Sequence, residues 1–377
     1  MIQRNATMAD VARLAGVGKM TVSRVLTGSA SVSATTAERV YRAIKVLHYQ
    51  PNEVARSLRA VNSKTIGVIV PYLYDPFFAT CAHAISTVAK QHGYSVILTT
   101  SDENPDIEQK QTSLMLRRQV DGLVIIPVSD NDRYYGGEAF SRVHVVTVDR
   151  PVRGSRFDSV LVPNRAGARI AVEHLLGHGH RSIAFLGLSR TLYTMKARYA
   201  GYREAMSGAG HSPRPYISCG SPERTAALIR SMLNSREPPT ALFAGNNLCM
   251  RYALHALSAS GIQIPQQIAM AGFDDFEMAD VLQPALTVVR QPIYQLGEVA
   301  ANLLFQRILG NDAPKPGHHV ILPVELVVRC SCGCQPPTHK SAKEEQPAPG
   351  ITPGQGRHRP PLDPTGETLN PPFDHRR

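Results

Sequence analysis

Two groups of residues have side chains and spacing that could bind a metal ion. His174 and His178 are four residues apart, with His180 nearby, so a helix would bring the first two imidazoles onto one face. Close to the C-terminal segment, a CxCxC pattern offers soft ligands for zinc or a redox pair: Cys330, Cys332 and Cys334. We expect no carboxylate or cysteine to complete a ligand set with the histidines. We therefore expect no metal and no cofactor, with zinc or redox chemistry at the cysteines as the alternative.

Sequence motifs for catalysis are missing. The chain contains no GxxxxGK[ST] phosphate loop, no GxSxG nucleophile turn and no HExxH metal-binding pair. We expect no catalytic residues and a protein that is not an enzyme; turnover of a bound ligand would contradict this.

Basic residues are concentrated near the N-terminus. Residues 1–61 contain nine lysines and arginines against three acidic residues, which accounts for +6 of the net charge of +11. A basic segment ahead of a nearly balanced body suggests a polyanionic partner. A solvated basic surface would have the same charge, so charge alone leaves both interpretations open.

The basic segment has the pattern of three short helices. Thr7 and Asp10 have capping-box spacing, and Gly16 can end the helix they begin. A second helix is expected over 19–26 after a tight turn, and Ser33 can cap a third that runs through Leu47. This order is typical of a helix-turn-helix DNA-binding unit.

In such a unit the start of the second helix faces base edges in the major groove. Lys19 and Arg24 can donate to guanine O6 and N7, whereas Met20 can only pack on an apolar surface such as a thymine methyl. Thr21 and Ser23 are expected to contact phosphates. The alternative for Met20 is a place in the core of the unit.

The elements that follow alternate between apolar strands and helices. TIGVIVP, SVILTT, DGLVIIP and VHVVTVD form one series, with helices expected over 77–92 and 105–118, and SIAFLG, TALFAG and IAMAGF form a second. This pattern predicts two doubly wound lobes with parallel sheets. Ligands of such folds bind beyond the carboxyl ends of the strands, here in a cleft between the lobes.

Length and composition agree with several domains in a soluble chain. The 377 residues are 43% hydrophobic and 19% charged, and no run approaches the roughly 18–20 apolar residues of a membrane span. The N-terminus has no secretion-signal pattern, and six scattered cysteines do not form a disulfide framework, so we expect a cytoplasmic protein. Residues 331–377 contain ten prolines and no periodicity, and we expect them to be disordered.

Beyond these patterns, the stretch TMADVARLAGVGKMTVSRVLTGSASVSATTAERV and its continuation to EVARSLR resembles the DNA-binding headpiece and hinge of the LacI/GalR family of bacterial transcription regulators. The motifs TIGVIVP, DPFF, ARYAGYREAM, FAGNN, AGFDD and LTVVRQP follow in the family's order, so the resemblance covers roughly residues 6–330. The variant KMTVSR also occurs in gluconate-type repressors, which is too short a match to identify a ligand.

The resemblance implies an all-α headpiece over 1–50, a hinge helix and linker over 51–61, and a two-lobed core over 62–330 similar to periplasmic binding proteins. Because the chain of such proteins crosses between lobes, we expect the N-lobe at about 62–162 plus 291–320 and the C-lobe at about 163–290 plus 321–330.

The resemblance also implies specific roles in the hinge, which begins near Asn52. Leu58 would wedge into a base step from the minor groove, with Ala55 allowing close approach and Arg56 and Arg59 near phosphates. The alternative is that Leu58 packs on the core.

Carried over position by position, the family's cleft residues are Phe77, Phe78, Asp149, Arg198, Asn246 and Asp274. Three departures from the family pattern affect the same region: Asp75 replaces the usual Asn, Asn247 the usual Asp, and Pro163-Asn164 the usual Asp-Asn. Phe77 could also serve only to pack its helix on the sheet.

The expected function is a sequence-specific repressor that binds a pseudo-palindromic operator as a homodimer in the bacterial nucleoid. A sugar or sugar acid bound in the cleft would lower its affinity for DNA. The alternatives are a regulator with a nucleobase co-repressor and a solute-binding protein of a transport system.

Overall fold

The computed structural model describes residues 6–26, 32–49, 63–130, 135, 137, 140, 143–310 and 316–334. It confirms the expected fold class, a helical N-terminal unit and an α/β core with two sheets that are parallel except for one strand. The expected hinge, 51–61, lies outside the described residues. Within the described ranges, no helix is long and apolar enough to span a membrane.

The N-terminal unit, which we call the headpiece, contains α1 (Met8–Ala15), α2 (Lys19–Leu26) and α3 (Ala34–Val46). The capping box of Thr7 and Asp10 is present, and Gly16 ends α1 with a φ of 64°, a conformation that favours glycine. Small apolar side chains from all three helices form the core of this unit, among them Val11, Val22, Val25, Val40 and Ala43. All three helices occur where the sequence predicted them.

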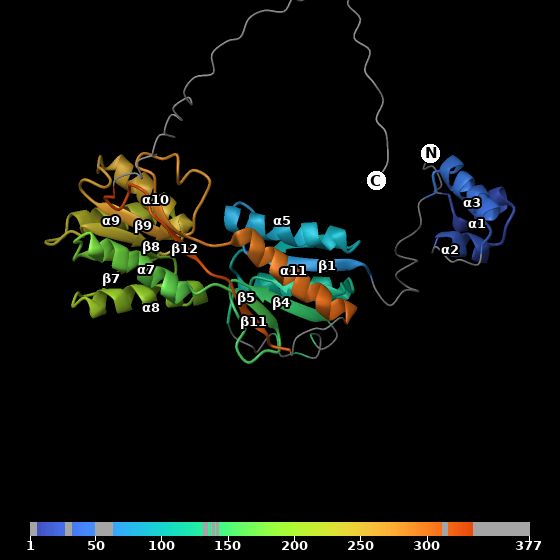
Figure 1. Ribbon diagram of the computed structural model, residues 1–377, viewed down its shortest axis with the longest axis horizontal. Helices are drawn as coiled ribbons and strands as arrows, with labels where there is room; N and C mark the ends of the chain where they lie inside the picture. The colour runs from blue at the N-terminus through green and yellow to red at the C-terminus, as the bar shows by residue number, and fades with distance from the viewer. Residues whose placement is uncertain are drawn as a thin grey trace, which may run out of the picture. The chain divides into compact units, whose positions relative to one another are not determined.

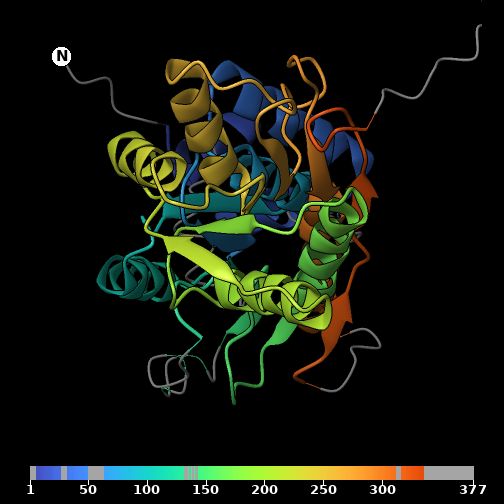
Figure 2. The same cartoon turned by 90° about the vertical axis from the view of Figure 1, so that its left-hand side faces the viewer.

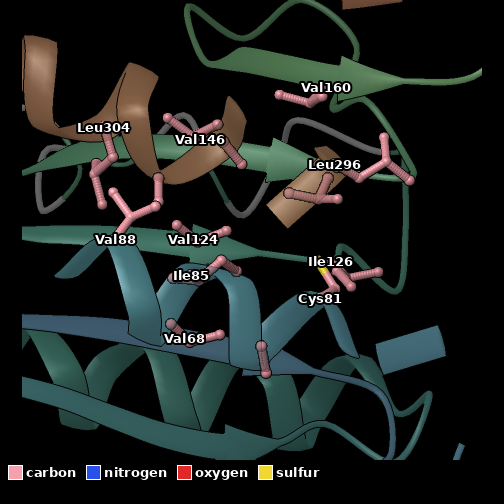
Figure 3. Packing of buried hydrophobic residues seen from close by; sticks show 14 of the residues in the cluster. Val68, Cys81, Ile85, Val88, Val124, Ile126, Val146, Val160, Leu296 and Leu304 are labelled. Carbon is pink, nitrogen blue, oxygen red and sulfur yellow. The ribbon is translucent and has the colours of Figure 1, made fainter. Parts of the chain in front are cut away.

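The N-lobe contains a six-stranded parallel sheet in the order β11-β5-β4-β3-β1-β2. Its strands are β1 (Thr65–Val70), β2 (Ser95–Thr100), β3 (Gly122–Ile125), β4 (His144–Val148), β5 (Asp158–Leu161) and β11 (His319–Ile321). Helices α5 (Pro76–Gln91) and α11 (Ile293–Leu309) lie side by side over one face (Figure 1). Figure 3 shows Val68, Val124 and Val146 of the strands packed with Ile85 and Leu304 of these helices. On the opposite face, Met115 of α6 (Pro105–Arg117) packs with the alternate strand residues.

The C-lobe sheet has the order β12-β10-β9-β8-β6-β7, with β12 antiparallel to β10. Its strands are β6 (Ile183–Gly187), β7 (Arg214–Ile217), β8 (Ala241–Ala244), β9 (Ala269–Phe273), β10 (Thr287–Arg290) and β12 (Glu325–Val327). The helices are α7 (Asn164–Gly177), α8 (Tyr193–Gly208), α9 (Pro222–Leu233) and α10 (Asn247–Ala259). Helices α7 and α8 lie side by side in both views (Figure 1, Figure 2), and Gly201 allows it because any side chain there would collide with the backbone of Arg165.

The chain passes between the lobes three times: after β5, after β10 and between β11 and β12. The last crossing comes slightly later than the expected boundary at 320. Ile321 still pairs with Leu161 in the N-lobe sheet, and the Leu322 N–H donates to the carbonyl of Leu161.

The expectation of disorder from residue 331 onward is wrong for its first residues. Ser331 and Cys332 are fully buried, and the Ser331 hydroxyl donates to the Met270 carbonyl at 2.6 Å while accepting from the Thr287 N–H at 2.8 Å. These bonds fix the segment beside β9 and β10. Residues 335–377 lie outside the described part of the chain.

Candidate functional site

A cleft of about 350 Å³ is lined by residues from both lobes. All six side chains expected there contribute to its lining: Phe77, Phe78, Asp149, Arg198, Asn246 and Asp274. They come from segments up to about 200 residues apart, and their meeting follows from the parallel sheets, whose strands end at the cleft. What these residues bind stays a prediction.

Asp149 and Asp274 hold equivalent positions in the two lobes. Asp149 follows β4 and Asp274 follows β9, and both have a left-handed backbone, with φ of 67° and 75°. This conformation is strained for a residue other than glycine and is found most often where a side chain must be aimed at a site. Both carboxyl groups are buried, and burial raises the pKa of each, with Arg150 and Arg198 respectively opposing that effect.

Arg198 is a buried guanidinium at the centre of the C-lobe wall. Its Nε donates to Asn164 at 2.7 Å, and its Nη1 donates to the Gly245 carbonyl at 2.8 Å and to Asp274 at 3.4 Å. The guanidinium carbon lies 3.8 Å from the ring centre of Phe273, which holds the plane in place. Its Nη2 makes no hydrogen bond with the described residues and is the part available to a ligand.

The departures at Asp75 and Asn247 belong together. The Asn247 Nδ2 donates to Oδ1 of Asp75 at 3.0 Å, and the same oxygen accepts from the Phe77 N–H at the start of α5. Each residue begins a helix of a different lobe, so this bond joins the N-lobe to the C-lobe beside the cleft.

Phe77 and Phe78 have two roles in the structure. Both line the cleft, yet both are buried and belong to the apolar core of the N-lobe. Tyr72 and Tyr74, which the sequence reasoning missed, also line the cleft and stack on each other with ring centres 5.0 Å apart. Burial raises the pKa of Tyr72 to about 12, so its hydroxyl keeps a proton to donate.

Further polar residues of the cleft were missed, among them Glu103, Arg150 and Gln291. Arg150 binds Glu103 through two hydrogen bonds of 2.6 and 2.8 Å and contacts Asp149 at 3.2 Å, so its charge is neutralised within the protein. Gln291 donates from Nε2 to Asp274 at 2.5 Å, while its buried Oε1 has no partner among the described residues. The motifs VDRP and VVRQP, which contain Arg150 and Gln291, were the only sequence signal for these two residues, and Glu103 had none.

One of the two polar groups of the Asn246 side chain is already used in a helix cap. Its side-chain oxygen accepts from the Cys249 N–H at 3.0 Å as the cap of α10, which leaves the Nδ2 group for a ligand. Together with Arg198 Nη2, the cleft thus offers donors, and the carboxylate of Asp149 offers an acceptor. A small molecule with several groups that both donate and accept hydrogen bonds would satisfy this set.

In the headpiece, Lys19, Met20 and Arg24 are exposed on α2, while Thr21 and Ser23 are half-buried. Met20 has 66% of its surface exposed, so the alternative of a core residue within the headpiece is wrong. The hinge residues expected to contact DNA, Asn52, Ala55, Arg56, Leu58 and Arg59, lie outside the described residues.

The expectation that no cysteine completes the histidine pair is also wrong. Cys332 and Cys334 lie against His174 and His178, and the four potential ligand atoms are all within 4.8 Å of one another. The sequence could not reveal this because the two pairs are about 156–160 residues apart. His180 and Cys330 are not members of the group.

The headpiece and the core of the chain each match a known protein family. Residues 7–52 match the model of bacterial regulatory proteins of the lacI family, and residues 172–332 match that of the periplasmic binding protein-like domain. The HTH-type transcriptional repressor PurR of Mannheimia succiniciproducens is 32% identical over 86% of this chain and 98% of its own length. A lac repressor dimer bound to operator and the anti-inducer ONPF is similar with a TM-score of 0.77 and 28% identity over 87% of this chain and 99% of that one. A complex of the transcriptional regulator CelR with cellobiose has a TM-score of 0.63 and 30% identity over 86% and 99%.

Proposed function

The chain belongs to the LacI family of bacterial regulatory proteins, and from this premise we propose that it is a repressor whose affinity for operator DNA is lowered by a neutral sugar bound in the cleft. Its family relatives are DNA-binding transcriptional repressors with a ligand-binding domain.

The observation that carries the choice of ligand is the balance of charge in the cleft. Among the described residues, four acidic side chains line it, namely Asp75, Glu103, Asp149 and Asp274. Two arginines line it, and one of them, Arg150, is already paired with carboxylates. A ligand carboxylate would therefore lie beside like charges, whereas the hydroxyls of a neutral sugar can donate to Asp149 and accept from Arg198. The half-buried rings of Tyr72 and Tyr252 offer faces for stacking. The cellobiose complex of a similar regulator supports a saccharide ligand.

On DNA, we infer a homodimer bound to a pseudo-palindromic operator, since one headpiece reads few bases and two-fold symmetry doubles the contacts. Each α2 would present Lys19, Met20 and Arg24 to the major groove, and Leu58 of the hinge would enter the minor groove. A regulator of this kind acts in the bacterial cytoplasm. The dimer of the similar lac repressor supports this arrangement.

Release of DNA follows if the ligand draws the lobes together. Movement of the lobes would separate the two hinge segments of a dimer, and a short hinge helix without its partner is unstable. Ligand and operator would then oppose each other through one coupling free energy, typically about 1–3 kcal/mol.

The test is a screen followed by a linkage experiment. Neutral sugars, sugar acids and nucleobases are compared for their effect on the melting temperature of the full chain, and the best ligand is titrated with and without operator. We expect a neutral sugar that binds about 5- to 150-fold more weakly in the presence of operator. Tighter binding with operator would instead identify a co-repressor, and a nucleobase as the best ligand would favour a purine- or pyrimidine-responsive regulator.

A further inference from the structure

The His174–His178–Cys332–Cys334 group has the dimensions of a tetrahedral metal site. The Cys332 sulfur lies 3.2 Å from Nε2 of His174, and the Cys334 sulfur lies 3.6 Å from Nε2 of His174 and 3.0 Å from Nε2 of His178. Zinc bonds of about 2.3 Å to sulfur and 2.0–2.1 Å to nitrogen separate tetrahedral ligands by roughly 3.3–3.8 Å. The protein therefore approaches this spacing with small side-chain adjustments.

Local structure fixes both halves of the group. His174 is in the last turn of α7 and His178 is its C-terminal cap, so both rings project from the same end of the helix, 4.7 Å apart. Gly333 has a φ of 93°, which favours glycine, and the turn it makes places Cys332 and Cys334 on the same side. The burial of Ser331 between Met270 and Thr287 anchors the cysteine turn to the sheet.

The ligand types also select the ion. Two imidazoles and two thiols, with no carboxylate in the group, suit zinc and other soft or borderline ions and disfavour magnesium or calcium. The Thr287 hydroxyl donates to the Cys332 sulfur at 3.1 Å, an outer hydrogen bond of the kind that orients metal ligands.

We propose that His174, His178, Cys332 and Cys334 form a structural zinc site that fastens the segment after β12 to the C-terminal end of α7. All four positions are filled by protein ligands, so the site is closed and has no place for a substrate. It lies outside the cleft, since none of its residues lines the cleft.

The experiment uses Co²⁺ as a spectroscopic probe of the full chain, purified under reducing conditions and freed of metal with a chelator. One Co²⁺ per chain should bind with the visible bands of tetrahedral cobalt and near-ultraviolet thiolate charge transfer, and Zn²⁺ should displace it. Zn²⁺ should also raise the melting temperature, because it binds the folded chain.

Two substitutions at the partly exposed ligands avoid the fully buried Cys332. His178→Ala and Cys334→Ser should each remove the tetrahedral spectrum and weaken Co²⁺ binding by more than the ~10- to 100-fold that loss of an outer partner costs. The matched controls are His255→Ala, at an exposed position of α10, and Cys330→Ser, both outside the group, and they should leave the spectrum unchanged.

Several results would contradict the proposal of a zinc site. These are a reduced chain that binds no Co²⁺, a spectrum that survives both ligand substitutions, and a spectrum lost equally in both controls. A Cys332–Cys334 disulfide in the freshly isolated chain, with no bound zinc, would assign the pair to redox chemistry instead.

Discussion

Asp75 and Asn247 are 172 residues apart in the sequence and share a hydrogen bond of 3.0 Å between the two lobes. Each residue alone departs from the family pattern, Asp for Asn at one position and Asn for Asp at the other. The structure shows that the two departures are hydrogen-bond partners, with the carboxylate in the N-lobe and the amide in the C-lobe.

The hydrogen bond between Asp75 and Asn247 predicts that one substitution in this pair can compensate for the other. Asn247→Asp should lower the free energy of unfolding by about 1–3 kcal/mol, because it places a second carboxylate against the buried Asp75. Adding Asp75→Asn should recover most of that loss, since Asn can also cap α5. Urea unfolding of the four proteins of the cycle measures the coupling. Additive effects of the two changes would mean that the bond contributes nothing.

The crossing of α7 and α8 predicts opposite effects for two glycines of one helix. Gly201→Ala should destabilise the protein by about 1–3 kcal/mol, because the new methyl collides with the backbone of Arg165. Gly208→Ala meets no atom within 4 Å and should stabilise the helix by up to about 1 kcal/mol. Thermal unfolding distinguishes them, and equal shifts would refute a close crossing.

The position of Arg198 in the cleft predicts that a substitution there weakens ligand binding without weakening DNA binding. Arg198→Lys keeps a positive charge near Asp274 but loses the forked geometry, so we expect ligand affinity to fall about 10- to 100-fold while operator affinity changes little. Calorimetry and operator gel shifts measure the two quantities. Arg203→Lys, an exposed position on the same helix, is the control, and it should alter neither.

The structure of the headpiece predicts different effects of alanine substitutions at exposed and at buried positions of α2. Met20→Ala should leave stability within about 0.5 kcal/mol, because its side chain is exposed, but should change the preferred operator base. Val22→Ala removes methyls from the core and should cost stability instead. Lys19→Ala or Arg24→Ala should cost about 1–3 kcal/mol of operator binding. Selection of binding sites from random DNA that returns the parental motif for all three exposed positions would exclude them from base recognition.

Sequence periodicity was enough to predict the headpiece helices and the strands β1–β4, β6, β8 and β9, but not the interior strands β5 and β10. TIGVIVP and SIAFLG are apolar throughout because central strands of a covered parallel sheet are buried on both faces. Of the edge strands, β2 was predicted from SVILTT, whereas β7, which reads RPYI, and β11, which reads HVI, were not, because each is too short and too polar to stand out as an apolar run.

From the sequence, cleft residues could be predicted only one position at a time, and not the contacts between them. Resemblance carried over Asp149 and Arg198 one at a time, but it could not show that Arg150 is engaged with Glu103 or that Gln291 holds Asp274. Pairing across the fold, like that of Cys334 with His178, depends on tertiary contacts that have no local pattern.

The strand order of the N-lobe has a consequence for the newly made protein. Ser159 of β5 pairs with His319 of β11, and the buried Asp158 accepts from Arg307, so both partners are synthesised about 150–160 residues later. At about 5–20 residues per second, translation reaches His319 roughly 8–30 s after Ser159. Until then the lobe has an open strand edge and an unpaired acid, while α11 is missing from its face. Although the N-lobe is the first lobe to leave the ribosome, it therefore cannot complete its sheet until nearly all of the C-lobe has been synthesised.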